Sequence, residues 1–138
     1  MKTTILTSVG VIGSFIASLF GGWDTSIITL LICMVIDFIS GLIVAGVFHT
    51  SKKTDNGALE SRAGWKGLCK KGMTLLIIVI ANRLDLQLGT SYIRDGVCIA
   101  FITNETLSII ENAGLMGIPV PNFVKNAIEL LKKKNEEK

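Results

Sequence analysis

The chain has 138 residues and a formal net charge of +3; 49% of its residues are hydrophobic and only 18% are charged. Its mean hydropathy is +0.56, and the apolar residues stand in long runs, with little chain left over to hide them from water. These totals exclude an ordinary soluble domain and predict a single all-α integral membrane domain over 1–138.

The first apolar run, 4–23, carries no charge and is long enough to cross a hydrocarbon core about 30 Å thick. It exceeds the roughly 7 to 15 apolar residues of a secretory signal and shows no clear cleavage site, so we expect a retained anchor. Small residues recur in it every three or four positions. Such rows let membrane helices approach closely, although Gly is also simply common there. The packing candidates are Gly10, Gly13, Ser14, Ala17 and Gly21.

The second run, 26–48, is interrupted only by Asp37. Asp37, Gly41 and Ala45 lie four residues apart, which places them on one helical face, and we expect Gly41 and Ala45 to serve helix packing. An aspartate at this depth is costly, so it faces a bundle interior, a water-filled cavity or a partner. The alternative is a neutral Asp37, hydrogen-bonded within the bundle. Both interpretations keep it away from lipid.

A polar, strongly basic segment follows at 50–71. Under the positive-inside rule this short loop stays in the cytoplasm. Its part from Glu60 to Lys71 has the composition of a basic amphipathic helix that lies on anionic headgroups. The basic residues expected at the membrane surface are Lys52, Lys53, Arg62, Lys66, Lys70 and Lys71.

Two further spans are predicted, at about 72–89 and 96–118. The apolar part of the third is short, so a full crossing carries Asn82, Arg83 and Asp85 into the far interface, and a partial insertion is the alternative. Pro119 and Pro121 then break the helix.

The tail 119–138 is predicted to restart as a short amphipathic helix at Asn122. Its apolar stripe holds Phe123, Ala127, Ile128 and Leu131, and its end carries the surface residues Lys132, Lys133 and Lys134. The basic loop and the Lys-rich tail both belong inside, as does the N-terminus. Four spans satisfy these constraints.

Polar side chains recur along the fourth span at positions i, i+1, i+4, i+7 and i+8. On a helix they form one continuous face: Asn104, Glu105, Ser108, Glu111 and Asn112. Acids at this depth do not face lipid, and a single protomer offers few cations there, because Arg83 and Arg94 lie nearer the outer edge. Two hypotheses remain. Several copies surround a shared aqueous lumen, or the acids are protonated or hydrogen-bonded in a closed bundle. The two states are compatible with one protein before and after opening.

The sequence offers no set of catalytic or metal-binding residues to accompany these acids. Cys33, Cys69 and Cys98 are far apart and fit free thiols, and His49 stands alone as an expected interfacial side chain. Without a nucleophile, a ligand set or a second base, we expect no enzyme activity, no metal and no cofactor. Nor do we expect a nucleic-acid partner.

Three motifs resemble the small phage-lysis and toxin-secretion holins of Gram-positive bacteria and their phages: "DFISGLIVA", "SRAGWKGLCKKG" and "NETLSIIENAGLMGIPVP". The third is the most specific. The resemblance covers about 37–131, leaving the first apolar run as a departure. Matching positions of the family pattern are Asp37, Asn104, Glu105, Ser108, Glu111, Asn112, Gly117, Pro119 and Pro121.

The resemblance implies a non-enzymatic protein of the bacterial cytoplasmic membrane that forms homo-oligomers and opens lesions. Through these an endolysin or a large toxin leaves the cell, the membrane potential is lost and the cell lyses. Two other functions stay open from the residues alone: a small ion or solute transporter component that uses Asp37 and Glu105 as a relay, and a scaffold that recruits a peptidoglycan hydrolase.

Overall fold

The chain folds into successive helices, and the computed structural model describes them over residues 1–136. Within that range there is no β-strand, so the predicted all-helical class is confirmed. Residues 137 and 138 of the expected tail, and the side chain of Phe123, lie outside the described residues. The elements are α1 (Lys2–Leu19), α2 (Thr25–Ile43), the π-helical turn η1 (Val44–Phe48), α3 (Ser61–Leu88), α4 (Ile93–Leu115) and α5 (Asn122–Glu136).

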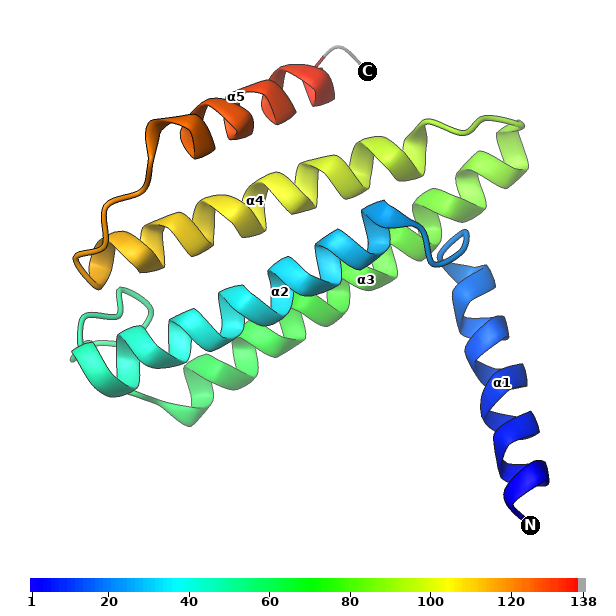
Figure 1. Ribbon diagram of the computed structural model, residues 1–138, viewed down its shortest axis with the longest axis horizontal. Coiled ribbons are helices and arrows are strands. Elements are labelled where there is room, and N and C mark those ends of the chain that lie inside the picture. The colour runs from blue at the N-terminus through cyan, green and yellow to red at the C-terminus, as the bar shows by residue number, and fades with distance from the viewer. Residues whose placement is uncertain (137–138) are drawn as a thin grey trace.

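Helices α2, α3 and α4 lie side by side and form the bundle, with the most extensive packing between α2 and α4 (Figure 1). The core side chains of α2 recur at spacings of three and four residues, as they do when one helical face is buried. The buried core cluster consists of Ile27, Leu30 and Met34 from α2, Ile78 from α3 and Cys98 from α4.

Helix α1 stands apart from the bundle, to which only its last turn is attached (Figure 1). It has no buried residue. Asn82 Nδ2 on α3 donates hydrogen bonds to the carbonyls of Leu19 at 3.2 Å and Ser18 at 3.4 Å. Gly10 and Gly13 have open space around them and make no close helix contact within the protomer, whereas Gly21, just past the end of α1, lies close against Asn82 and Arg94.

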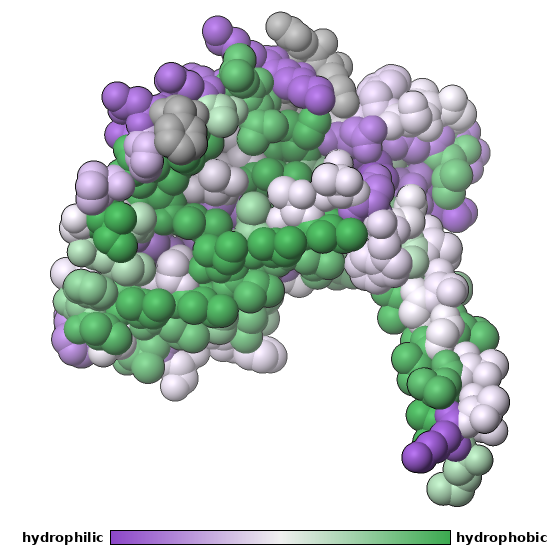
Figure 2. Space-filling model, viewed as in Figure 1, coloured by the Kyte–Doolittle hydropathy of each residue, from purple (hydrophilic) through white to green (hydrophobic). Residues whose placement is uncertain are grey.

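Two helical segments are long and apolar enough to cross a membrane: Lys2–Leu19, and Thr25–Phe48. Figure 2 shows hydrophobic residues along one side of α1 and on the flank of the bundle near α2, while hydrophilic residues gather along α5. The first two predicted spans therefore coincide with helices of the required length and composition, within a few residues at their ends.

The third helix differs from its predicted boundaries. The sequence predicts a surface helix from Glu60 to Lys71 at the end of the basic loop and a separate span from about 72, but α3 is one continuous helix of 28 residues that begins at Ser61. No helix-breaking residue separates the basic half from the apolar half, and the Gly residues at 64, 67 and 72 are tolerated. This continuity fixes the direction in which every side chain from Ser61 to Leu88 points.

Helix α4 ends at Leu115, and Gly117 takes a left-handed φ of 81° just before the Pro-containing segment that includes Pro119 and Pro121. Helix α5 then returns along α4 (Figure 1). Ile128, from the predicted apolar stripe, is buried, whereas Lys133 and Lys134 are exposed in the last turn. The tail is thus part of the folded unit.

Candidate functional site

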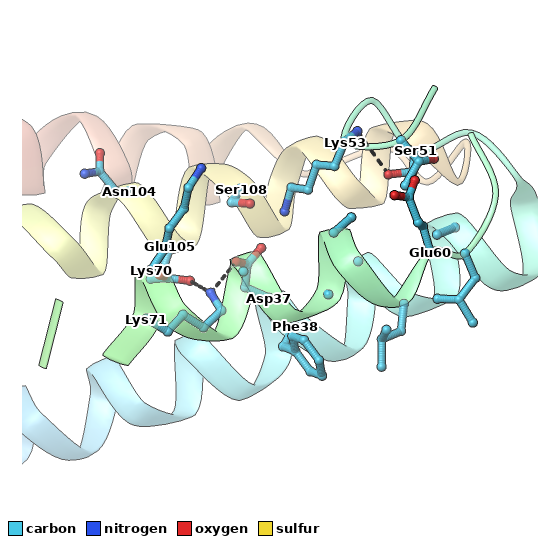
Figure 3. A pocket seen from close by; sticks show the side chains of 18 of the residues that line it. Asp37, Phe38, Ser51, Lys53, Glu60, Lys70, Lys71, Asn104, Glu105 and Ser108 are labelled. Carbon is cyan, nitrogen blue, oxygen red and sulfur yellow. Dashed lines mark hydrogen bonds and ion pairs between the residues drawn. The ribbon is translucent and has the colours of Figure 1, made fainter. Parts of the chain in front are cut away.

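Three charged side chains from three helices meet inside the bundle. Lys71 Nζ on α3 lies 2.7 Å from Asp37 Oδ2 on α2 and 2.7 Å from Glu105 Oε2 on α4 (Figure 3). The side chains of Asp37, Glu105 and Lys71 are 6%, 13% and 16% exposed. We call these three residues the charged cluster. One ammonium group bridges two carboxylates, so a single cation ties all three helices together.

Seven-residue spacing explains why these side chains are inside. On α3, Lys71 lies seven residues before the fully buried Ile78, and on α4, Glu105 lies seven residues after the fully buried Cys98. Seven residues are close to two helical turns, so each charged residue shares a face with a core residue. The same α4 spacing continues to Asn112, which is also buried.

Asn112 adds a second layer to the cluster. Its Nδ2 donates to Ser40 Oγ at 2.8 Å and to Asp37 Oδ1 at 3.3 Å. Asp37 therefore has a partner for each carboxylate oxygen, one from α3 and one from α4. A buried polar group with all its partners in place is held firmly in one geometry.

The predicted polar face of the fourth span is divided by the edge of the bundle. Glu105 and Asn112 point inward, whereas their neighbours Asn104 and Glu111 are exposed. Glu111, 56% exposed, pairs with Lys52 at 3.3 Å. Successive residues on a helix are about 100° apart, which suffices to place one inside and the next outside. The five side chains do not all point the same way within one protomer.

The basic residues of 50–71 fall into two groups, exposed and inward-facing. Of the six predicted to lie at the membrane surface in 50–71, five are exposed: Lys52, Lys53, Arg62, Lys66 and Lys70. Lys71 is not, because its ammonium group sits between two carboxylates. Our expectation that a protomer offers few cations at this depth overlooked this lysine, which becomes an inward-facing residue once α3 extends back to Ser61.

A cavity of about 240 Å³ adjoins the charged cluster, between α2, α3, α4 and the loop before α3. Asp37, Lys71, Glu105 and Ser108 line it, together with apolar side chains such as Phe38 and Leu42. Small residues leave this space open, because none carries a large side chain: Gly41 on α2, Ala45 in η1, and Gly64 and Gly67 on α3. Small residues here create room beside the cluster.

A second polar network joins the other end of the bundle. Arg94, at the start of α4, has a side chain only 7% exposed. Its guanidinium donates to Asp24 Oδ2 at 2.7 Å and Oδ1 at 3.0 Å, and to the carbonyls of Phe20 and Gly22. Asp24 also caps α2 by accepting from the Ile27 amide at 3.1 Å. The turn between α1 and α2 is thereby fixed to α4.

Asp85 completes this network from α3. Its carboxylate accepts from Thr90 Oγ1 at 2.6 Å and from the amides of Ile93 at 3.0 Å and Arg94 at 2.9 Å. These amides belong to the first turn of α4, which otherwise lacks acceptors. The sequence predicted Arg94 and Asp85 near the outer interface but gave no sign that they connect separate helices.

The Asp24 carboxyl makes this end of the protein sensitive to acid. Hydrogen bonding from the Arg94 guanidinium holds the pKa of Asp24 below its usual range. A lowered folded-state pKa stabilises the fold above the unfolded pKa of about 3.9, and that stabilisation is lost as pH falls through the folded value. We expect thermal stability in detergent to drop below about pH 4. Asp24→Asn should flatten this drop, and Asp55→Asn, in the exposed loop, should leave it unchanged.

Comparison with known proteins identifies the family. A family model described as the bacteriophage holin family matches residues 14–133. The chain belongs to this holin family. A probable holin of Bacillus phage phi105 is 28% identical over 110 residues, covering 79% of this chain and 76% of that protein. The resemblance seen in the sequence is confirmed.

Bacterial relatives match over more of the chain. An uncharacterized protein of Listeria monocytogenes is 37% identical over 126 residues, covering 91% of this chain and 84% of its own length. One from Clostridium perfringens is 33% identical over 138 residues, covering 97% and 96%. No solved structure matches the chain. Holin family membership implies a non-enzymatic membrane protein, and the two apolar helices of membrane length agree with a place in the membrane.

Proposed function

We propose that this holin-family chain assembles into homo-oligomers in the bacterial cytoplasmic membrane and opens lesions that dissipate the membrane potential. An endolysin, or a large toxin, leaves through them, and the cell lyses. The match to the holin family over residues 14–133 is the observation that carries the proposal. The fold adds support, because its apolar helices suit lipid and its polar groups cluster between helices.

The proposed topology has four crossings with both termini inside. Helices α1 and α2 with η1 supply two apolar spans. Helices α3 and α4 carry charges, but those nearest the bundle interior are paired, as the contacts of Lys71 and Arg94 illustrate. Pairing lowers the cost of carrying a charge through the membrane. The exposed lysines of the loop before α3 and of α5 then meet anionic headgroups of the inner leaflet.

The lumen of the assembly is proposed to receive the polar face of α4 together with Asp37. Asn104 and Glu111 already lie outside the protomer core, and Glu105, Ser108 and Asn112 lie just inside it. Water in a lumen solvates carboxylates and amides that lipid does not. Helix α1 has no buried residue, and Gly10 and Gly13 on it meet no other helix within the protomer, so it offers a surface for contact with another copy.

Replacing both glutamates by leucine tests the lumen role. Glu105→Leu with Glu111→Leu should preserve insertion into the membrane but abolish release of a cytoplasmic reporter enzyme, because an apolar face does not hold a hydrated opening. Fractionation and reporter activity in the medium measure the two effects. Glu129→Leu, an exposed position on α5, is the matched control and should release normally. Undiminished release from the double variant contradicts the lumen role.

A further inference from the structure

The charged cluster holds α4 in an orientation that a lumen-facing α4 must abandon. Lys71 Nζ keeps 2.7 Å contacts to Asp37 on α2 and to Glu105 on α4. Asn112 donates from α4 to Ser40 and Asp37 on α2. If these side chains line a shared aqueous space, they give up their contacts with one another and form hydrogen bonds to water instead. The same groups do not do both at once, so the closed protomer and the open assembly differ in these contacts.

Lys71 supplies the cation of the charged cluster. Two carboxylates share its one ammonium group, and removal of a buried partner leaves charges uncompensated. The cavity beside the cluster separates α2 from α3 over this region, so little else ties α3 to α2 there. The neighbouring Lys70 is exposed and, among the described residues, forms no salt bridge.

We infer that Lys71 is a lock: its bridge to Asp37 and Glu105 keeps the protomer closed, and release of this bridge with separation of α4 from α2 precedes opening of the membrane. The inference rests on the proposed holin function. Two packings of the same helices then compete, and the strength of the bridge sets how readily the open one is reached.

Lys71→Met tests the lock directly. Without the cation, the ratio of closed to open protomers should fall by on the order of tenfold. After induction, loss of membrane potential and release of a reporter enzyme should start at least about twofold sooner, at equal amounts of protein in the membrane. Lys70→Met, the adjacent matched control, should follow wild-type timing. Wild-type timing in Lys71→Met overturns the inference.

If Lys71→Met does not accumulate in the membrane, a reversible disulfide tether between α2 and α4 tests the inference instead. Cys33 Sγ on α2 lies 4.0 Å from Thr106 Oγ1 on α4, so Thr106→Cys places two thiols within reach of a disulfide. The exposed Cys69 is changed to Ser to prevent other pairing. Oxidation should join α2 to α4 and block release, and reduction should restore it. The control combines Thr106→Cys with Cys33→Ser, which lacks the pair and should release under both conditions.

The outcomes separate the lock from the function on which it rests. If the tethered chain, shown by mass spectrometry to be fully cross-linked, releases the reporter as fast as the reduced chain, α2 and α4 need not part and the lock is rejected. If the wild-type and reduced chains release nothing and the membrane potential persists, the proposed holin function fails instead.

Discussion

Arg94→Met is expected to lower the free energy of unfolding by about 3 kcal/mol. Methionine replaces the apolar stem but leaves the carbonyls of Phe20 and Gly22 without their donor, and Asp24 loses contacts at 2.7 Å and 3.0 Å. Asp24 is 49% exposed and regains water, which keeps its share of the loss modest. Denaturant unfolding in mild detergent, followed by circular dichroism, measures the change.

Arg83→Met is the matched control for this substitution. Arg83 lies on α3 with an exposed side chain and forms no salt bridge among residues 1–136, so its replacement should cost less than about 0.5 kcal/mol. Arg94→Lys should fall between the two, because one ammonium group does not reach both oxygens of Asp24 and the carbonyls together. Equal stabilities of Arg94→Met and Arg83→Met contradict the role assigned to Arg94.

Gly21→Ala is expected to cost about 3 kcal/mol, through two effects at one position. Gly21 has a φ of 82°, which strains any other residue, and an added Cβ lies 2.6 Å from Asn82 Oδ1 and 2.9 Å from Arg94 Nε. Asn82 and Arg94 are the residues that hold the end of α1 and the following turn. Displacing them should loosen α1, which faster amide hydrogen exchange at Leu19 and Phe20 will report.

Gly22→Ala separates strain from collision. Gly22 also has a left-handed φ, 102°, but an added Cβ there meets nothing within 4 Å. We expect a loss of about 1 to 2 kcal/mol, from backbone strain alone. The difference between the two variants measures the collision with Asn82 and Arg94. If both lose the same stability, the close approach at Gly21 has no energetic role.

The positions of the first two helices follow from hydropathy, because long uncharged runs such as 4–23 have few alternatives to a helix of membrane length. The charged cluster was harder to foresee. Lys70 and Lys71 are chemically identical neighbours, and only the register of α3 decides which one points inward. The seven-residue spacing from Lys71 to Ile78 predicts that Lys71 faces inward, but only if both residues lie on one uninterrupted helix.

The polar residues of the fourth span illustrate a second limit. Spacing alone showed that Glu105 and Glu111 lie on one broad side of a helix, but it did not show where the bundle edge crosses that side. That edge depends on which residues of α2 face α4, a property of the tertiary packing. Hence Glu105 is bridged to Lys71 in the interior, while Glu111 meets Lys52 at the surface.

Because α1 is attached by its last turn alone, substitutions along most of its length should disturb the folded bundle far less than substitutions between α2, α3 and α4. Its residues before the last turn contribute no packing partner to the protomer, so a replacement of similar apolarity and length there should leave the folded core intact and alter only what α1 meets outside the protomer.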